Sequence, residues 1–187
     1  MAAKKIDYFS ALYEVAKVIN ASLSPSKALD EIVNRVADTM NLKACSLRLL
    51  DSKKKKLLMG AQHGLSEGYI RKGPVLVKES GLDQKALKGK SILLKNAQTD
   101  PDFQYGDKAK AEGIKSVMVV PLMKEKRAIG VLRGYSATER EFKEEEVRFM
   151  EAVANLSAIA LENAKLHQAL RRDFDLLVAH EYRLDDQ

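Results

Sequence analysis

The chain has 187 residues, which suits one compact domain with an extension rather than two full domains. Apolar residues make up 45% of the sequence and charged residues 31%, a composition that excludes an intrinsically disordered chain. The single cysteine, Cys45, excludes an internal disulfide and a thiolate metal cluster, and no apolar run approaches the roughly 18 residues of a membrane-spanning helix. We therefore expect a cytoplasmic protein with no membrane contact.

The net charge of +6 is unevenly distributed along the chain. Lysine and arginine are concentrated in residues 43–95, whereas acidic residues outnumber basic ones in residues 138–187. A basic region of this kind can attract nucleic acid. However, few aromatic residues are interspersed with these charges, and the densest run, residues 53–56, lies where a hairpin turn is expected. The pattern therefore favours a solvent-exposed face, and nucleic-acid binding is not expected.

Two helices are predicted near the N-terminus. In the first, apolar residues recur every three or four positions, which is typical of a coiled-coil seam, and this seam includes Phe9, Leu12 and Ile19. Ser24 is a typical N-cap residue and Pro25 is favoured at the first helical position, so a second helix is expected to begin there.

Two hairpins and a short strand are predicted in the centre of the chain. Strand-like runs at residues 44–50 and 57–63 flank a polar turn, and a further strand is expected at residues 91–95. The second hairpin reads GIKSVMVVPLMKEKRAIGVLRGYS, starting at Gly113. In its first strand the residues of both faces are mostly apolar, so both faces of this sheet are expected to be covered.

A long helix is expected to begin at Glu141, and neither proline nor glycine occurs after Gly134. Its apolar residues form two adjacent stripes, which predicts two packing partners: the sheet of its own domain and a second subunit. If the helix ends at Arg183, it is about 65 Å long. A small domain cannot cover this length, so the C-terminal end is expected to project or to pair.

The second hairpin and the segment VRFMEAVANLSAIALENAKL after it resemble the second half of a GAF domain, and ACSLRLLDSKKKKLLMGAQHGL resembles its first hairpin. GPVLVKESGLDQKALKGKSILLKNAQTDPDF resembles the middle of the same family. The resemblance implies an α+β, profilin-like fold with a central antiparallel sheet of five or six strands. It places the N- and C-terminal helices on one face and short helices and loops that form a pocket on the other. We expect a dimerisation helix in residues 1–23, the GAF domain in 24–170 and a helical extension in 171–187.

The resemblance implies sensing rather than catalysis, with ligands that differ among family members: cyclic nucleotides, tetrapyrroles, haem, small anions or amino acids. The N-K-F-D-E signature of the cyclic-nucleotide branch and the acidic-proline motif of the bilin branch are missing from this sequence. The methionine sulfoxide reductase branch relies on several cysteines, and this chain has one. His63, the only histidine of the domain core, is more often a surface residue than a haem ligand. We therefore expect no enzyme and no metal site, and the ligand and cofactor stay unknown.

Arg48 lies among apolar residues of a predicted strand, where a guanidinium needs a carboxylate or an anionic ligand. Two readings stay open: a salt bridge to Asp100 or Asp102, or a contact with a bound ligand. The positions expected to face the pocket are Ser46, Arg48, Asn96, Asp100, Phe103, Tyr105, Ser116 and Met118.

The C-terminal segment RRDFDLLVAHEYRLDD resembles the phosphoacceptor helix of sensor histidine kinases, with His180 at the phosphorylated position. The Thr-Pro pair that typically follows is replaced by Leu184 and Asp185, and no ATP-binding domain follows in this sequence. Two functional hypotheses result. The first is a sensor that dimerises through its first helix and through the long helix. The second is a phosphorelay or scaffold component without a ligand, with a histidine kinase or response regulator as its partner.

Overall fold

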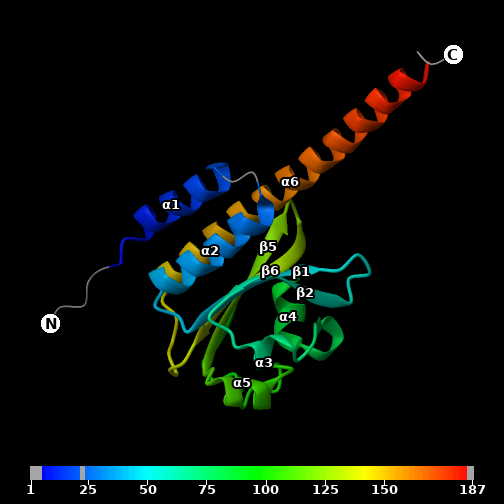
Figure 1. Cartoon of the computed structure of the whole chain (residues 1–187). Coiled ribbons are helices and arrows are strands. Elements are labelled where there is room, and N and C mark those ends of the chain that lie inside the picture. Colours follow the sequence, from blue (N-terminus) through cyan, green and yellow to red (C-terminus); the bar gives the residue numbers. More distant parts are fainter. Residues whose placement is uncertain (1–5, 22–23, 185–187) are drawn as a thin grey trace.

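A six-stranded antiparallel sheet forms the centre of the molecule, with strand order β3-β2-β1-β6-β5-β4 (Figure 1). The computed structural model describes residues 6–21 and 24–184, and side chains as far as residue 176. The strands are β1 (Ala44–Leu50), β2 (Lys56–His63), β3 (Val75–Leu76), β4 (Ile92–Leu94), β5 (Ser116–Lys124) and β6 (Arg127–Ser136). The helices are α1 (Tyr8–Ala21), α2 (Pro25–Thr39), α3 (Glu67–Ile70), the 3-10 turn η1 (Val77–Glu79), α4 (Gly81–Ala86), α5 (Gly106–Glu112) and α6 (Glu144–Leu184).

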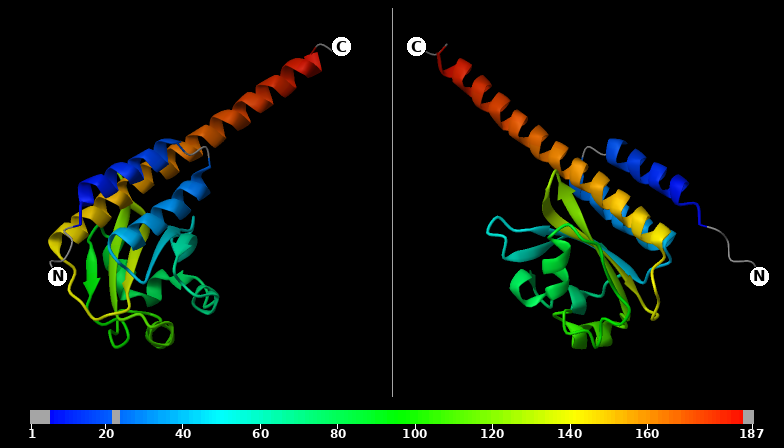
Figure 2. Two further views of the ribbon diagram at one scale, coloured as in Figure 1. Left: turned by 60° about the vertical axis from the view of Figure 1, so that its left-hand side comes forward. Right: turned by 180° about the vertical axis from the view of Figure 1, so that it is seen from behind.

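Helices α1, α2 and α6 lie together on one face of the sheet (Figures 1 and 2). The helix α2 begins as predicted, with Ser24 in an extended conformation at the N-cap and Pro25 in the first turn. The apolar side chains of α2 and α6 pack against one face of β1, β5 and β6 and form a continuous buried cluster. Members of this cluster include Ile32, Val36, Leu47, Met118, Val120, Leu132, Met150 and Val153.

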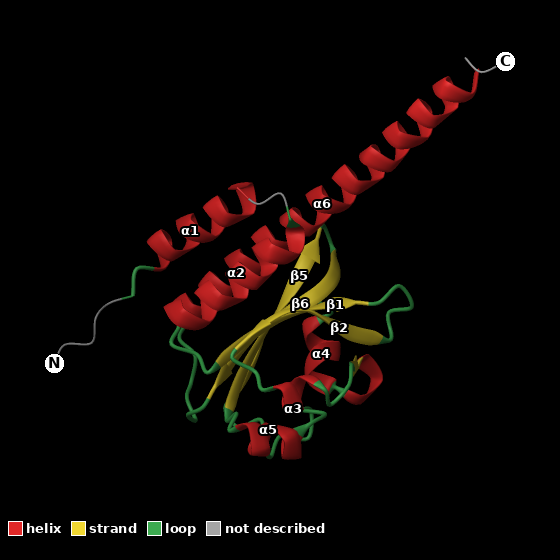
Figure 3. Ribbon diagram, viewed as in Figure 1, coloured by secondary structure: helices red, strands yellow, loops and turns green. Residues whose placement is uncertain are grey.

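The opposite face is covered by a lid, which we define as residues 64–115 without β3 and β4. It contains α3, η1, α4 and α5 and the loops that join them (Figure 3). A second buried cluster fills the space between this lid and the sheet, with Val117 and Val119 of β5 among its members. Alternate residues of β5 therefore contribute to two separate buried clusters, one on each face of the sheet. This confirms the prediction that both faces of the hairpin are covered.

Helix α6 starts three residues later than predicted, at Glu144, and continues for 41 residues. The start is fixed locally, because the Glu146 carboxylate accepts a hydrogen bond of 2.7 Å from the backbone N–H of Lys143. Only the first half of α6 crosses the sheet, and the second half projects beyond the domain, as expected from its length (Figures 1 and 2). Residue 180 lies in this helix, but its side chain is outside the described residues.

Within the described ranges, no helix is both long enough and apolar enough to cross a membrane.

Gly130 of β6 allows the two central strands to approach closely. A Cβ atom at this position would lie 2.3 Å from the carbonyl oxygen of Arg48 in β1. We predict that Gly130→Ala lowers the free energy of unfolding by about 1–3 kcal/mol, because the strand backbones must separate. Urea unfolding followed by circular dichroism measures this change.

Gly68→Ala is the matched control. Gly68 lies in α3, and the nearest atom to an added Cβ is 3.9 Å away, so this change is expected to alter stability by less than about 0.5 kcal/mol. Equal effects of the two substitutions would contradict the assigned contact between β1 and β6.

Candidate functional site

The two central strands carry polar side chains on the face that the lid covers. Ser46 and Arg48 come from β1, and Arg133 and Tyr135 come from β6. Alternate residues of a strand share a face, and the register places Ser46 directly opposite Arg133. The Ser46 and Tyr135 hydroxyls are hydrogen-bonded at 3.0 Å. All four side chains are buried.

Arg48 is 1% exposed, and its Nε and Nη2 atoms have no hydrogen-bond partner within the described part of the chain. The salt bridge considered from the sequence is not formed. Asp102 instead pairs with Lys85, and Asp100 accepts a hydrogen bond of 2.9 Å from the backbone N–H of Asp102. A buried guanidinium with two unpaired nitrogens is costly, because these donors have lost their hydration without gaining a replacement.

Arg133 has a partial partner. Its Nη2 atom pairs with one carboxylate oxygen of Asp83, a fully buried residue of α4, and Ser80 donates a 2.6 Å hydrogen bond to the same oxygen. The other oxygen of Asp83 and the Nε atom of Arg133 have no partner among the described residues. The ion pair therefore links α4 to β6, while one atom of each side chain still lacks a hydrogen-bond partner within the described residues.

Lys72 lies in the segment between α3 and β3, on the lid side of these buried polar residues. Its Nζ atom lies 3.8 Å from the ring centroid of Tyr69 and 5.0 Å from that of Tyr105, and both contacts are cation–π interactions. Burial, followed by the positive charges of Arg48 and Arg133, lowers the pKa of Lys72 to about 7. This lysine can therefore change its charge near neutral pH.

Tyr69 of α3 connects Lys72 to the sheet. Its ring meets the ring of Tyr135 edge-on, with centroids 6.3 Å apart. Burial, and then the neighbouring Tyr135, raise the pKa of Tyr69, so its phenol stays protonated and available as a donor. Its hydroxyl group has no partner in the described structure.

We call these residues the basic cluster: Ser46, Arg48, Tyr69, Lys72, Ser80, Asp83, Arg133 and Tyr135. Its unpartnered buried atoms are five donors and one acceptor: Arg48 Nε and Nη2, Arg133 Nε, Lys72 Nζ, Tyr69 Oη and Asp83 Oδ1. Such an excess of donors complements a group that offers acceptor oxygens.

The basic cluster contains two of the eight residues predicted to face the pocket, Ser46 and Arg48. Tyr105 lies beside it through the contact with Lys72, and its hydroxyl donates to the Pro74 carbonyl at 3.1 Å. Phe103 is buried in the apolar core of the lid.

Two further predicted residues, Asn96 and Asp100, shape the loop that carries them. Asn96 accepts a 3.0 Å hydrogen bond from the backbone N–H of Gln98, and Asp100 accepts one from Asp102. These bonds make both residues part of the loop's own structure.

The predicted placement of Ser116 and Met118 beneath the lid is wrong. Met118 belongs to the buried cluster on the helical side, because the side-chain alternation of β5 directs Val117 and Val119, not Met118, toward the lid. The hydroxyl of Ser116 lies 2.7 Å from the Lys95 carbonyl oxygen and accepts a 2.8 Å hydrogen bond from the backbone N–H of Arg140. Ser116 therefore holds the segment before α6 in place.

Among the described residues of the basic cluster with an unpartnered polar atom, four were not predicted from the sequence: Tyr69, Lys72, Asp83 and Arg133. The signal for Arg133 was present, because it is a charged residue within an apolar strand, as is Arg48. The other three lie in short lid helices or loops, where no periodic pattern indicates which side chains turn inward.

Cys45 and His63 do not lie in the basic cluster. Cys45 is buried on the helical side of β1, and burial raises the pKa of its thiol, which disfavours the reactive thiolate. His63 is exposed at the end of β2. No group of three or more His, Cys, Asp or Glu side chains within the described ranges could hold a metal ion.

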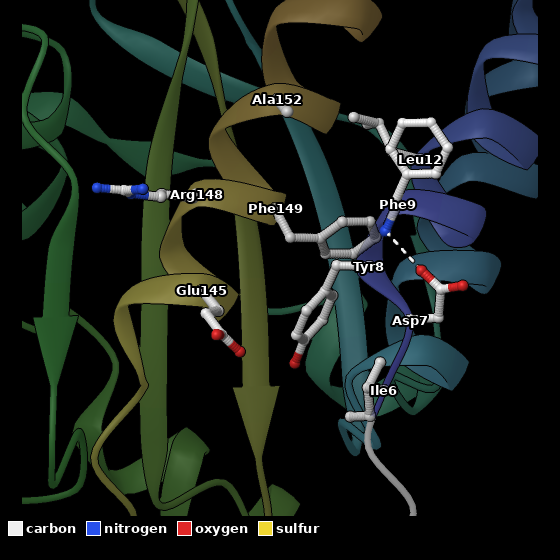
Figure 4. A pocket seen from close by; sticks show the side chains of 9 residues that line it. All are labelled: Ile6, Asp7, Tyr8, Phe9, Leu12, Glu145, Arg148, Phe149 and Ala152. Carbon is white, nitrogen blue, oxygen red and sulfur yellow. Dashed lines mark hydrogen bonds between the residues drawn. The ribbon is translucent and has the colours of Figure 1, made fainter.

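A separate hollow lies on the helical side, between the start of α1 and the start of α6 (Figure 4). It has a volume of about 540 Å³. The rings of Tyr8 and Phe149 pack together in it at 5.1 Å, while Phe9 beside them is 81% exposed. Asp7 caps α1 by accepting a 3.1 Å hydrogen bond from the backbone N–H of Phe9.

A single antiparallel sheet, with the terminal helices on one face and a lid of short helices on the other, defines this chain as a GAF-type α+β domain. The chain belongs to the GAF domain family, whose pattern matches residues 22–162.

Two of the similar proteins are regulators. The chain is similar to the formate hydrogenlyase transcriptional activator of Salmonella typhimurium, with 26% identity over 97% of this chain and 27% of the activator. It is also similar to the Nif-specific regulatory protein of Azorhizobium caulinodans, with 25% identity over 93% of this chain and 29% of that protein. The chain thus spans somewhat more than a quarter of the length of these relatives.

The fold is shared with the GAF domain of the Acinetobacter phosphoenolpyruvate-protein phosphotransferase. The two structures superpose with a TM-score of 0.72 and 25% sequence identity, over 84% of this chain and 94% of that domain. The chain is therefore similar both to two regulatory proteins and to the GAF domain of a phosphotransferase.

The shifted pKa of Lys72 makes stability depend on pH. In the unfolded chain Lys72 has its ordinary pKa of 10.5, so between about pH 7 and 10.5 the unfolded chain binds the extra proton. The free-energy cost of burying the charged lysine is fully present below pH 7. It disappears as the pH rises from about 7 to 10.5, so the free energy of unfolding increases over this range. We predict that the stability advantage of Lys72→Met over the natural protein shrinks from pH 6.5 to pH 9.5 in urea unfolding.

Lys78→Met serves as the control, because the side chain of Lys78 is 81% exposed. Its stability difference from the natural protein is expected to be independent of pH. A pH-independent difference for Lys72→Met as well would mean that Lys72 titrates normally.

Proposed function

We propose that this chain is a sensory GAF domain that binds a small molecule beneath its lid and transmits binding through α6 in a homodimer. The observation that carries the proposal is Arg48, a buried guanidinium with two free donors on the central strand. A ligand that accepts hydrogen bonds from Arg48 would offset the free-energy cost of burying these donors without partners. The regulatory relatives support a sensory rather than a catalytic role.

The sheet connects the basic cluster to α6. Arg133 faces the lid, whereas its neighbour Leu132 belongs to the helical-side cluster together with Met150 of α6. A displacement of β6 by a ligand therefore changes the packing of α6, because close-packed side chains transmit small movements. The ligand would select between two arrangements of α6 according to its affinity for each.

The projecting half of α6 carries an exposed apolar stripe. Ile159, Leu166, Leu170 and Phe174 recur at spacings of seven, four and four, and each is more than half exposed. This pattern is typical of one helix of a coiled coil, and an exposed apolar stripe of this length usually marks an interaction surface. A second copy of α6 would cover it.

Helix α1 offers less exposed apolar surface for the proposed interface than its three predicted residues, Phe9, Leu12 and Ile19, would if all were exposed. Phe9 is exposed, but Leu12 and Ile19 are partly buried against the chain's own helical layer. A groove of about 1090 Å³, lined in part by Ile19, Leu170 and Phe174, separates the end of α1 from the projecting part of α6. The phosphoacceptor role of His180 stays a prediction.

Dimerisation is tested by sedimentation velocity at micromolar concentration. We predict a dimer for the natural chain and a shift to monomer in the Leu170→Glu, Phe174→Glu double variant, because two buried carboxylates per helix oppose association. Arg172→Glu places a glutamate on the opposite face of the helix and is expected to leave the dimer intact. A monomeric natural chain would contradict the dimeric part of the proposal.

Ligand binding is tested by native mass spectrometry of protein purified from its own host. We predict that a small molecule stays bound to the natural chain and is lost from Arg48→Met. The variant is expected to stay folded, because replacing a buried charge by an apolar side chain of similar length is often neutral or stabilising. No additional bound mass on the natural chain, or the same additional bound mass on both proteins, would contradict a ligand at Arg48.

A further inference from the structure

We infer that the ligand of this domain is a small dicarboxylate, with one carboxylate on the free edge of Arg48 and the other beside Lys72. This inference rests on the proposed function, because it assigns a chemical class to the ligand beneath the lid. It is carried by the charges of the basic cluster, by the geometry of the free donors and by the apolar residues around them.

The charges around the basic cluster leave two cations without a counter-charge. Arg133 is paired with Asp83, and Glu112 of α5 lies 4.0 Å from Lys43 and accepts a 2.8 Å hydrogen bond from the backbone N–H of Ser66. The remaining charged groups that act on this site are Arg48, which is always positive, and Lys72, which is positive when protonated. A ligand with two negative charges would neutralise the interior, whereas a single charge would leave one cation uncompensated.

The free atoms of Arg48 have the geometry of a carboxylate site. Nε and Nη2 form one edge of the planar guanidinium group, and their N–H bonds are nearly parallel. A carboxylate accepts both at once, in a bidentate pair. Both atoms lack a partner within the described chain, so the whole edge is available.

The surroundings of Arg48 favour a carbon skeleton over an inorganic dianion. Met59 of β2 and Val131 of β6 lie opposite Arg48 on its two sides in the sheet. Val131 belongs to the apolar lid-side cluster, and the partly buried Met59 packs against that cluster. Methylene groups between two carboxylates can pack against them, whereas sulfate or phosphate would expose oxygens to apolar side chains.

Lys72 would couple binding to proton uptake. In the free protein its pKa is about 7, and a carboxylate beside it raises this value, in addition to the effects of Glu112, Asp83 and the two arginines already present. Above pH 7 the lysine must therefore gain a proton when the ligand binds. The affinity for a dicarboxylate is expected to fall by up to about tenfold per pH unit above pH 7.

The test is isothermal titration calorimetry with malonate, succinate and glutarate at constant ionic strength, at pH 6.5 and 8.5. Acetate, sulfate and the neutral succinamide are the comparison probes. We expect at least one dicarboxylate to bind with a dissociation constant at least about tenfold below those of all three comparison probes. We also expect Arg48→Met and Lys72→Met each to weaken its binding by about tenfold or more, and the pH dependence to disappear in Lys72→Met.

Lys78→Met is the control for the loss of a lysine charge, and it is expected to bind as the natural chain does. No binding of any dicarboxylate, or equal binding of acetate, sulfate or succinamide, would overturn the inference. Unchanged binding by Arg48→Met would overturn it as well. If native mass spectrometry still finds a bound neutral or singly charged molecule, the proposed sensory function stands and only the dicarboxylate assignment fails. An empty protein in both experiments would overturn both.

Discussion

The buried guanidinium of Arg48 is the constraint around which the lid side of the domain is organised. It lies on a central strand, with β2 on one side and β6 on the other, so the side chain cannot reach solvent without a change in the sheet or the lid. Asp83 is paired with Arg133, and Asp102, which the sequence offered as a partner for Arg48, is paired with Lys85. A protein that required only stability could place an apolar residue at this position. Under the proposed function, this charge serves to bind the ligand.

The alternation of β1 and β6 links this site to the helical layer. Residues that carry polar groups beneath the lid alternate with apolar residues that pack against α2 and α6. The two faces therefore share the same backbone, and neither can move independently. The projecting half of α6 continues beyond the domain, where its apolar stripe is exposed.

The sequence predicted those parts of the fold that depend on periodic patterns. The two hairpins, the start of α2 at Pro25 and the length of α6 are all confirmed, because each follows from local periodicity or from a residue with restricted backbone geometry. The face to which each strand residue points was harder to predict. In β5 both faces are apolar, so nothing in the pattern indicated that Met118 lies toward the helices rather than the lid.

The site was predicted only where it lies on a strand. Arg48 was recognisable as a charge among apolar residues, but its environment depends on which lid side chains turn inward. Asp83 and Lys72 come from short segments whose conformation is set by tertiary contacts, such as the pairing of Asp83 with Arg133 and the stacking of Lys72 on Tyr69. Local sequence carries little information about such contacts.

The most direct measurement is a crystal structure of the protein purified from its own host. We predict electron density for a bound carboxylate against the Nε and Nη2 edge of Arg48, with the side chain still beneath the lid. A guanidinium that instead pairs with a carboxylate of the protein, or that turns out toward solvent, would contradict it.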